Sequence, residues 1–142
     1  MVLKTILVPL DSSALSETVI QILGELQLRS ETKVVLAHVI PPEGAAIDTS
    51  ADRPSTNPDE FPYRQIERQL QAYQANLSCN SELEIVSGDP AEEIIRLANI
   101  HQADLIVLGN RGLTGMKRIL QGSVSSQVVA ESPCSVMVVK SN

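Results

Sequence analysis

The chain is poor in aromatic residues, and this scarcity limits what it can bind. Of its 142 residues only 2% are aromatic, and none is tryptophan. A surface that stacks single-stranded nucleic acid needs several rings, which this sequence cannot supply. The formal net charge of −6 also opposes contact with phosphate backbones. We therefore expect no nucleic acid among the partners.

Cysteine, histidine and long apolar runs are also scarce. Cys79 and Cys134 lie far apart, and with His38 and His101 they show no spacing typical of a zinc site. Two thiols in a reducing compartment are the simplest interpretation, and a regulatory disulfide is the alternative. No apolar run reaches the roughly 18 residues of a membrane span, and the N-terminus lacks the pattern of a secretory signal. The sequence predicts a cytoplasmic protein with no membrane segment and no metal held by protein ligands.

Short apolar runs alternate with stretches of helical periodicity. The runs lie at residues 3–10, 34–40, 83–86, 105–108 and 136–139. Most are unbroken and β-branched, as is typical of parallel strands covered on both faces. Between them apolar residues recur at helical spacing, and Asp89-Pro90-Ala91-Glu92 has the composition of a helix start. We predict a single α/β domain over residues 1–142, with five parallel strands, right-handed crossovers and helices on both faces.

Two of the expected strands have the character of sheet edges. The run at 83–86 is mixed in polarity, as an edge strand can be. The last run, Val136–Val139, is too apolar for a bare edge in water. Pairing with a second copy is the simplest way to cover it, so we expect a homodimer through this strand.

The segment from Pro41 to Pro62 interrupts the alternation of strands and helices. It contains five of the eight prolines, together with small polar residues, and these oppose regular structure. A loop of this length is usually functional or disordered. Residues 41–62 are therefore interpreted as a variable, mobile loop, with a lid over the site as the alternative.

The most informative stretch is rich in glycine and follows the run at 105–108. Gly109, Gly112, Gly115 and Gly122 precede a helix that we expect to begin near Ser123. Glycines let a ligand approach the backbone closely, and a helix start offers free N–H groups to an anion. Three of the chain's 11 cations lie in the same loop, namely Arg111, Lys117 and Arg118. A phosphate site is favoured over a loop whose glycines merely turn the chain.

Motif spacing excludes several phosphate-binding and hydrolytic families. The chain has no G-x-x-x-x-G-K-S/T and no G-x-G-x-x-G after its first strand, which argues against P-loop and dinucleotide-binding proteins. A G-x-S-x-G nucleophile elbow is also missing.

The glycine spacing resembles that of universal stress proteins of the ATP-binding type, which carry G-x2-G-x9-G-S/T. Gly109, Gly112, Gly122 and Ser123 fit this pattern in full. The stretches ILVPLD at residues 6–11, ADLIVLGNRG and SPCSVMVVK resemble the family's first, fourth and fifth strands, so the resemblance covers nearly the whole chain. It implies a Rossmann-like sheet with strand order 3-2-1-4-5.

The resemblance also implies roles for individual residues around ATP or AMP. The phosphates and ribose would contact Gly109, Gly112, Gly122 and Ser123, with further contacts from Val124 and Ser125. The adenosine end would contact Pro9 and Asp11, the backbone of Val39 and the side chain of Leu108. Asp11 has a carboxylate suited to ribose hydroxyls or the adenine amino group, and its alternative role is to cap the following helix. Arg111 lies inside the motif and is a candidate phosphate contact, and Mg²⁺ could bind through the phosphates.

Three functions remain open at this stage. The favoured one is a homodimeric, nucleotide-binding regulator of a stress response, whose occupancy alters its conformation or its binding to an unknown protein partner. The second is a slow ATPase or self-phosphorylating protein, which has little support because no metal pair or P-loop lysine is present. The third is a dimeric scaffold without a nucleotide. Cyclic AMP remains a candidate ligand, because the motif does not specify the number of phosphates.

Overall fold

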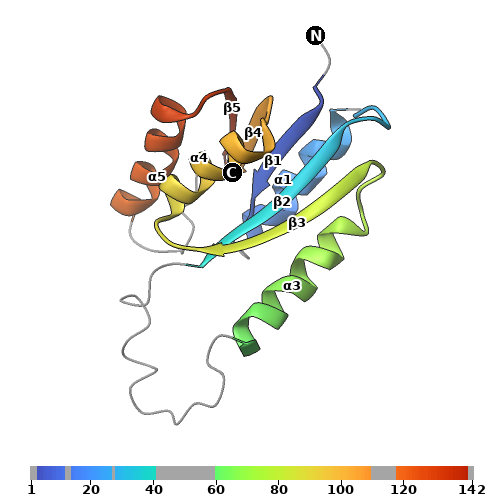
Figure 1. Ribbon diagram of the computed structural model, residues 1–142, viewed down its shortest axis with the longest axis horizontal. Coiled ribbons are helices and arrows are strands. Elements are labelled where there is room, and N and C mark those ends of the chain that lie inside the picture. The colour runs from blue at the N-terminus through green and yellow to red at the C-terminus, as the bar shows by residue number, and fades with distance from the viewer. Residues whose placement is uncertain (1–2, 12–13, 27, 41–59, 110–117, 141–142) are drawn as a thin grey trace.

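The computed structural model describes residues 3–11, 14–26, 28–40, 60–109 and 118–140. In these residues a parallel sheet of five strands has the order β3-β2-β1-β4-β5, which confirms the predicted fold (Figure 1). The strands are β1 Thr5–Pro9, β2 Lys33–Ile40, β3 Asn80–Ser87, β4 Leu105–Gly109 and β5 Ser135–Val139. The helices are α1 Ala14–Glu25, α3 Glu60–Gln74, α4 Pro90–His101 and α5 Arg118–Glu131.

Two apolar clusters cover the two faces of the sheet. One contains Ile6, Val8 and Leu36 together with side chains of α1 and α3. The other contains Leu7, Val35 and Ile106 together with side chains of α4 and α5. Alternate residues of one strand thus enter opposite clusters, as the period of two requires. Both faces are buried, which explains why the central strands are unbroken apolar runs.

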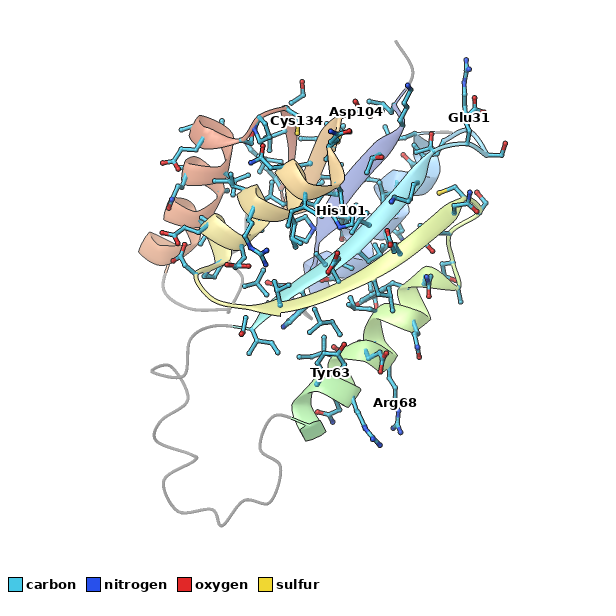
Figure 2. The ribbon with its side chains drawn as sticks, viewed as in Figure 1. Glu31, Tyr63, Arg68, His101, Asp104 and Cys134 are labelled. Atoms are coloured by element: carbon cyan, nitrogen blue, oxygen red, sulfur yellow. The ribbon has the colours of Figure 1, made fainter. Side chains whose placement is uncertain are left out.

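The two edge strands differ in polarity, as the sequence predicts. β3 carries Glu82 and Glu84 on the face that α4 covers, and Lys33 of β2 pairs with Glu82 at 3.0 Å. His101, in the last turn of α4, places Nε2 2.7 Å from Oε2 of Glu84 (Figure 2). These charges oppose edge-to-edge pairing at β3. The other edge, β5, is apolar and half-buried from Val136 to Val138.

The start of α4 has the predicted cap. Asp89 has an extended backbone and accepts a hydrogen bond from the N–H of Glu92 at 3.0 Å. Pro90 occupies the first turn, where its missing N–H has no intrahelical partner to lose. Gly88 precedes the cap with φ +144, a conformation that L side chains rarely adopt.

Two predicted helix boundaries are wrong. The expected loop at 41–62 overlaps α3, which begins at Glu60. Pro62 lies in the first turn of α3, where proline is tolerated, while residues 41–59 lie outside the described residues. The last helix begins at Arg118 instead of near Ser123. Arginine, leucine and glutamine at 118–121 are good helix formers, and an interior glycine such as Gly122 costs only about 1 kcal/mol.

The amino ends of the central strands are fixed by one carboxylate. Oδ2 of Asp104, just before β4, accepts hydrogen bonds from the N–H groups of Lys4 at 2.9 Å and Thr5 at 3.0 Å (Figure 2). The N–H of Asp104 in turn donates to the carbonyl of Thr5 at 2.8 Å. On the other side of β1, the buried hydroxyl of Thr32 donates to the carbonyl of Leu3 at 2.7 Å. Together these bonds set the register of β1 between β2 and β4.

We expect Asp104→Ala to lower the free energy of unfolding by about 1–3 kcal/mol, because two backbone N–H groups lose a charged acceptor. Urea unfolding at neutral pH measures this change. Glu131→Ala is the matched control, since Glu131 is an exposed carboxylate at the end of α5. Equal stability of the two variants would contradict the role given to Asp104.

Candidate functional site

The candidate site lies where the order of the strands reverses. β1 pairs with β2 on one side and with β4 on the other, and all pairings are parallel. The helices that follow β1 and β2 cover one face of the sheet, and those that follow β3 and β4 cover the opposite face (Figure 1). The chain therefore leaves β1 and β4 in opposite directions at the carboxyl edge of the sheet. Parallel α/β sheets bind ligands at such a point.

Five of the predicted site residues meet at this edge. Pro9 is the last residue of β1, and Asp11 follows it, half-exposed. Val39 is the last residue but one of β2, and Leu108 and Gly109 end β4. Val39 is 8% exposed, which suits the expected contact through its backbone. Leu108 is only 2% exposed and packs within the cluster under α4 and α5. Stacking of its side chain on a base would require that cluster to open.

The remaining predicted site residues belong to the glycine-rich segment. Arg111 and Gly112 lie outside the described residues. Gly122 and Ser123 lie in the second turn of α5, because this helix begins earlier than predicted. Val124 is half-buried against the cluster that α4 and α5 cover, and Ser125 is half-buried in the same turn. The first described turn of α5 is therefore formed by residues 118–121.

Asp11 and His38 belong to a polar cluster at the carboxyl edge, on the face of the sheet that α1 and α3 cover. The hydroxyl of Ser16, in α1, donates to Oδ1 of Asp11 at 3.4 Å. Nδ1 of His38 lies 2.9 Å from the carbonyl of Leu10. Since a carbonyl only accepts, Nδ1 carries the proton in this bond. Burial lowers the pKa of His38, while the Leu10 carbonyl and the charge of Asp11 act in the opposite direction.

Sequence reasoning missed Ser16 as a member of this cluster. Ser16 is 2% exposed, on the same face of α1 as Val19, Ile20 and Leu23. A serine at helical spacing with a buried stripe is a signal that its hydroxyl has a partner in the core. Nearby, the ring of Tyr73 in α3 packs against the apolar cluster that α1 and α3 cover. Burial, and next the negative charge of Glu17, raises the pKa of this phenol.

The site combines acceptors at one end with donors at the other. Asp11 offers carboxylate oxygens next to the ends of β1 and β2, and α5 offers N–H groups and the positive end of its dipole. Within the described residues, no group of three or more His, Cys, Asp or Glu side chains could hold a metal ion. Among the helices of that same part of the chain, none is long and apolar enough to cross a membrane.

The model of the universal stress protein family matches residues 3–140. The chain belongs to this family. Universal stress protein Sll1388 of Synechocystis sp. is 30% identical to it, with 95% of this chain and 96% of that protein covered. Other curated relatives match over shorter stretches, and for the first four of them these stretches cover 34, 41, 37 and 35% of the relative's length.

Solved structures of this family share the fold. The structure of the protein MJ0577, from Methanocaldococcus jannaschii, superposes with a TM-score of 0.83 at 26% identity and covers 100% of this chain and 99% of its own. A universal stress protein solved in complex with cAMP has a TM-score of 0.68 at 26% identity, with 99% of this chain and 98% of that chain covered. The family and the predicted strand order are thus confirmed.

The burial of His38 makes stability depend on pH. The folded state disfavours the protonated imidazole, so the unfolded chain takes up the proton first as the pH falls below about 6.5. In this window the free energy of unfolding therefore decreases as the pH decreases. We expect His38→Gln to reduce this loss between about pH 7.5 and pH 5.5, as measured by urea unfolding. His101→Gln is the control and should keep the pH-dependent loss of stability that His38 contributes. A pH profile of stability in His38→Gln that equals the wild-type profile would refute the assignment.

Proposed function

We propose that this universal stress protein binds an adenine nucleotide at the carboxyl edge of β1 and β4. The observation that carries the proposal is the reversal of strand order at this edge, with Asp11 on one side and the start of α5 on the other. The family membership supports it, and so does the relative of the same fold that was solved with cAMP. The ligand in view is ATP, AMP or cyclic AMP.

The two ends of the nucleotide would meet different chemistry. Asp11 accepts hydrogen bonds from ribose hydroxyls or from the adenine amino group, beside Pro9 and the backbone of Val39. The glycines of the motif, Gly109, Gly112 and Gly122, let phosphates approach the backbone. Mg²⁺, where present, binds through phosphate oxygens, as is usual for this ion.

At the phosphate end, the free N–H groups of the first turn of α5 complement negative charge. Further contacts are proposed for Arg111, Ser123, Val124 and Ser125. The hydroxyls of Ser123 and Ser125 and the backbone amide of Val124 would act as hydrogen-bond donors, Arg111 would act as a countercharge, and none of them supplies a general base. Occupancy is proposed to act by changing the surface offered to a partner protein, and any hydrolysis is expected to be slow.

A calorimetric titration with AMP, ATP and cyclic AMP tests the site. We expect Asp11→Ala to weaken binding about 10- to 100-fold, the size of a hydrogen bond to a charged group. Gly122→Val should abolish binding, because a branched side chain takes the space beside the phosphates. Gly24→Val is the matched control, since a Cβ at Gly24 would meet nothing within 4 Å and this glycine is exposed on α1. Absence of heat with all three nucleotides would refute the proposal.

We further propose that the protein acts as a homodimer through β5. This strand is the apolar edge of the sheet, and Val136, Met137 and Val138 are only half-buried in the single chain. A second copy would cover this strand, whereas in an isolated chain the edge would remain exposed to water and open to pairing.

Sedimentation velocity measures this association. We expect Val136→Glu to convert dimers to monomers, because a charge would be buried in the interface. Ile100→Glu is the control, because Ile100 is 57% exposed on α4. Circular dichroism of both variants separates loss of the dimer from loss of the fold. A wild-type protein that sediments as a monomer would contradict the proposal.

A further inference from the structure

The ring of His38 holds the backbone of the residue that precedes Asp11. Nδ1 of His38 lies 2.9 Å from the carbonyl oxygen of Leu10, and since a carbonyl only accepts, Nδ1 is the donor. The N–H of Leu10 donates to the carbonyl of Ala37 at 2.8 Å. Both backbone polar groups of Leu10 are therefore bonded to β2, although β1 itself ends at Pro9.

The planarity of the peptide bond carries this restraint to Asp11. The carbonyl of Leu10 and the N–H of Asp11 belong to one planar unit, so the direction of one fixes the direction of the other. The same unit ends at the Cα of Asp11, from which the carboxylate projects. A bond that holds the Leu10 carbonyl thus limits the places that the carboxylate can take at the carboxyl edge.

The place of His38 in β2 indicates that the bond, and not packing, accounts for a histidine there. The alternation of side chains puts Val34, Leu36 and His38 on one face of the strand. Val34 and Leu36 are 0% exposed in the cluster with α1 and α3, and His38 is half-buried. An aliphatic side chain would continue this face, whereas a ring N–H costs free energy on burial unless it has a partner. The Leu10 carbonyl is that partner.

The ring of His38 is neutral near pH 7 and carries its proton on Nδ1. Burial lowers the pKa of His38, and this effect is larger than the opposite effects of the Leu10 carbonyl and of the charge of Asp11. In a neutral imidazole one nitrogen donates and the other accepts, and the hydrogen bond at one nitrogen decides which of them is protonated. The bond to Leu10 therefore forms without a positive charge that would compete with a ligand for the Asp11 carboxylate.

We propose that His38 is a positioning residue of the nucleotide site, which places the Asp11 carboxylate by holding the peptide between Leu10 and Asp11. This role rests on the proposed function, because it assigns that carboxylate to the ligand. A group that is held before the ligand arrives loses less conformational freedom on binding. A side chain of β2 thereby controls the adenosine end of a site that lies between β1 and β4.

Binding of AMP to matched variants of His38 tests this role by calorimetry. His38→Leu removes the ring N–H and keeps an apolar side chain, and we expect it to raise Kd about 3- to 10-fold, the size of one hydrogen bond. His38→Asn should keep Kd within about twofold of the wild type, because the asparagine amide nitrogen is bonded to Cγ, as Nδ1 is, and also donates. His101→Leu, at the other histidine of the chain, is the control and should leave Kd unchanged.

A double-mutant cycle separates positioning of Asp11 from a general effect on the fold. In an Asp11→Ala background, His38→Leu should alter Kd by less than about 1.5-fold, because the carboxylate being positioned is gone. A purely structural role of His38 would weaken binding equally in both backgrounds. Urea unfolding of each variant confirms that it is folded under the conditions of the titration.

Nitrogen NMR of the imidazole tests the bond in the absence of nucleotide. The protein has two histidines, so His101→Gln leaves His38 as the single ring to be assigned. At neutral pH we expect a proton on Nδ1 and none on Nε2. A proton on Nε2 alone would overturn the role, since Nδ1 would then have nothing to donate to Leu10.

The outcomes separate the positioning role from the nucleotide site itself. If His38→Leu has no effect on AMP binding, or weakens it equally with and without Asp11, the positioning role is overturned while the site stands. If the wild type binds no nucleotide, the site fails and the positioning role fails with it, even where the proton is found on Nδ1. Loss of affinity in His38→Leu, its rescue in His38→Asn and coupling to Asp11 together support the role.

Discussion

The pairing of β1 on both of its sides is the constraint on which the rest of the molecule depends. Because β2 and β4 both run parallel to β1, the connections after β1 and β4 must cover opposite faces, and the chain parts at their carboxyl ends. This places Asp11, which follows β1, and Gly109, which ends β4, at the same edge. The amino edge, by contrast, is closed by backbone bonds to Asp104 and Thr32. Hydrogen bonds thus fix the amino edge of the sheet, whereas the carboxyl edge carries polar side chains that can bind a ligand.

Buried residues orient the polar groups at the carboxyl edge of the sheet. The hydroxyl of Ser16 donates to Asp11 at 3.4 Å, and Nδ1 of His38 donates to the carbonyl of the neighbouring Leu10 at 2.9 Å. A buried polar group requires a defined partner, so these contacts give the edge an orientation that apolar packing alone would not. The same requirement makes the edge sensitive to protonation of His38.

Local sequence patterns predicted the helices and strands, but they did not predict contacts between residues that are far apart in the sequence. The unbroken runs and the Asp89-Pro90 start are local signals, and each lies where it was predicted. The strand order came from the resemblance of the glycine motif to a family, because periodicity does not specify which strands are neighbours. The start of α5 was misplaced because Gly122 looked like a boundary, whereas the helix tolerates it. The bond from Ser16 to Asp11 was not predicted, because only the place of a serine in the buried stripe of α1 indicates it.

A crystal structure of the protein grown with AMP tests the location of the ligand most directly. We expect electron density at the carboxyl edge between β1 and β4, with adenosine beside Asp11 and the phosphate toward the start of α5. Nucleotide bound at another surface, or an unchanged edge at saturating AMP, would contradict it.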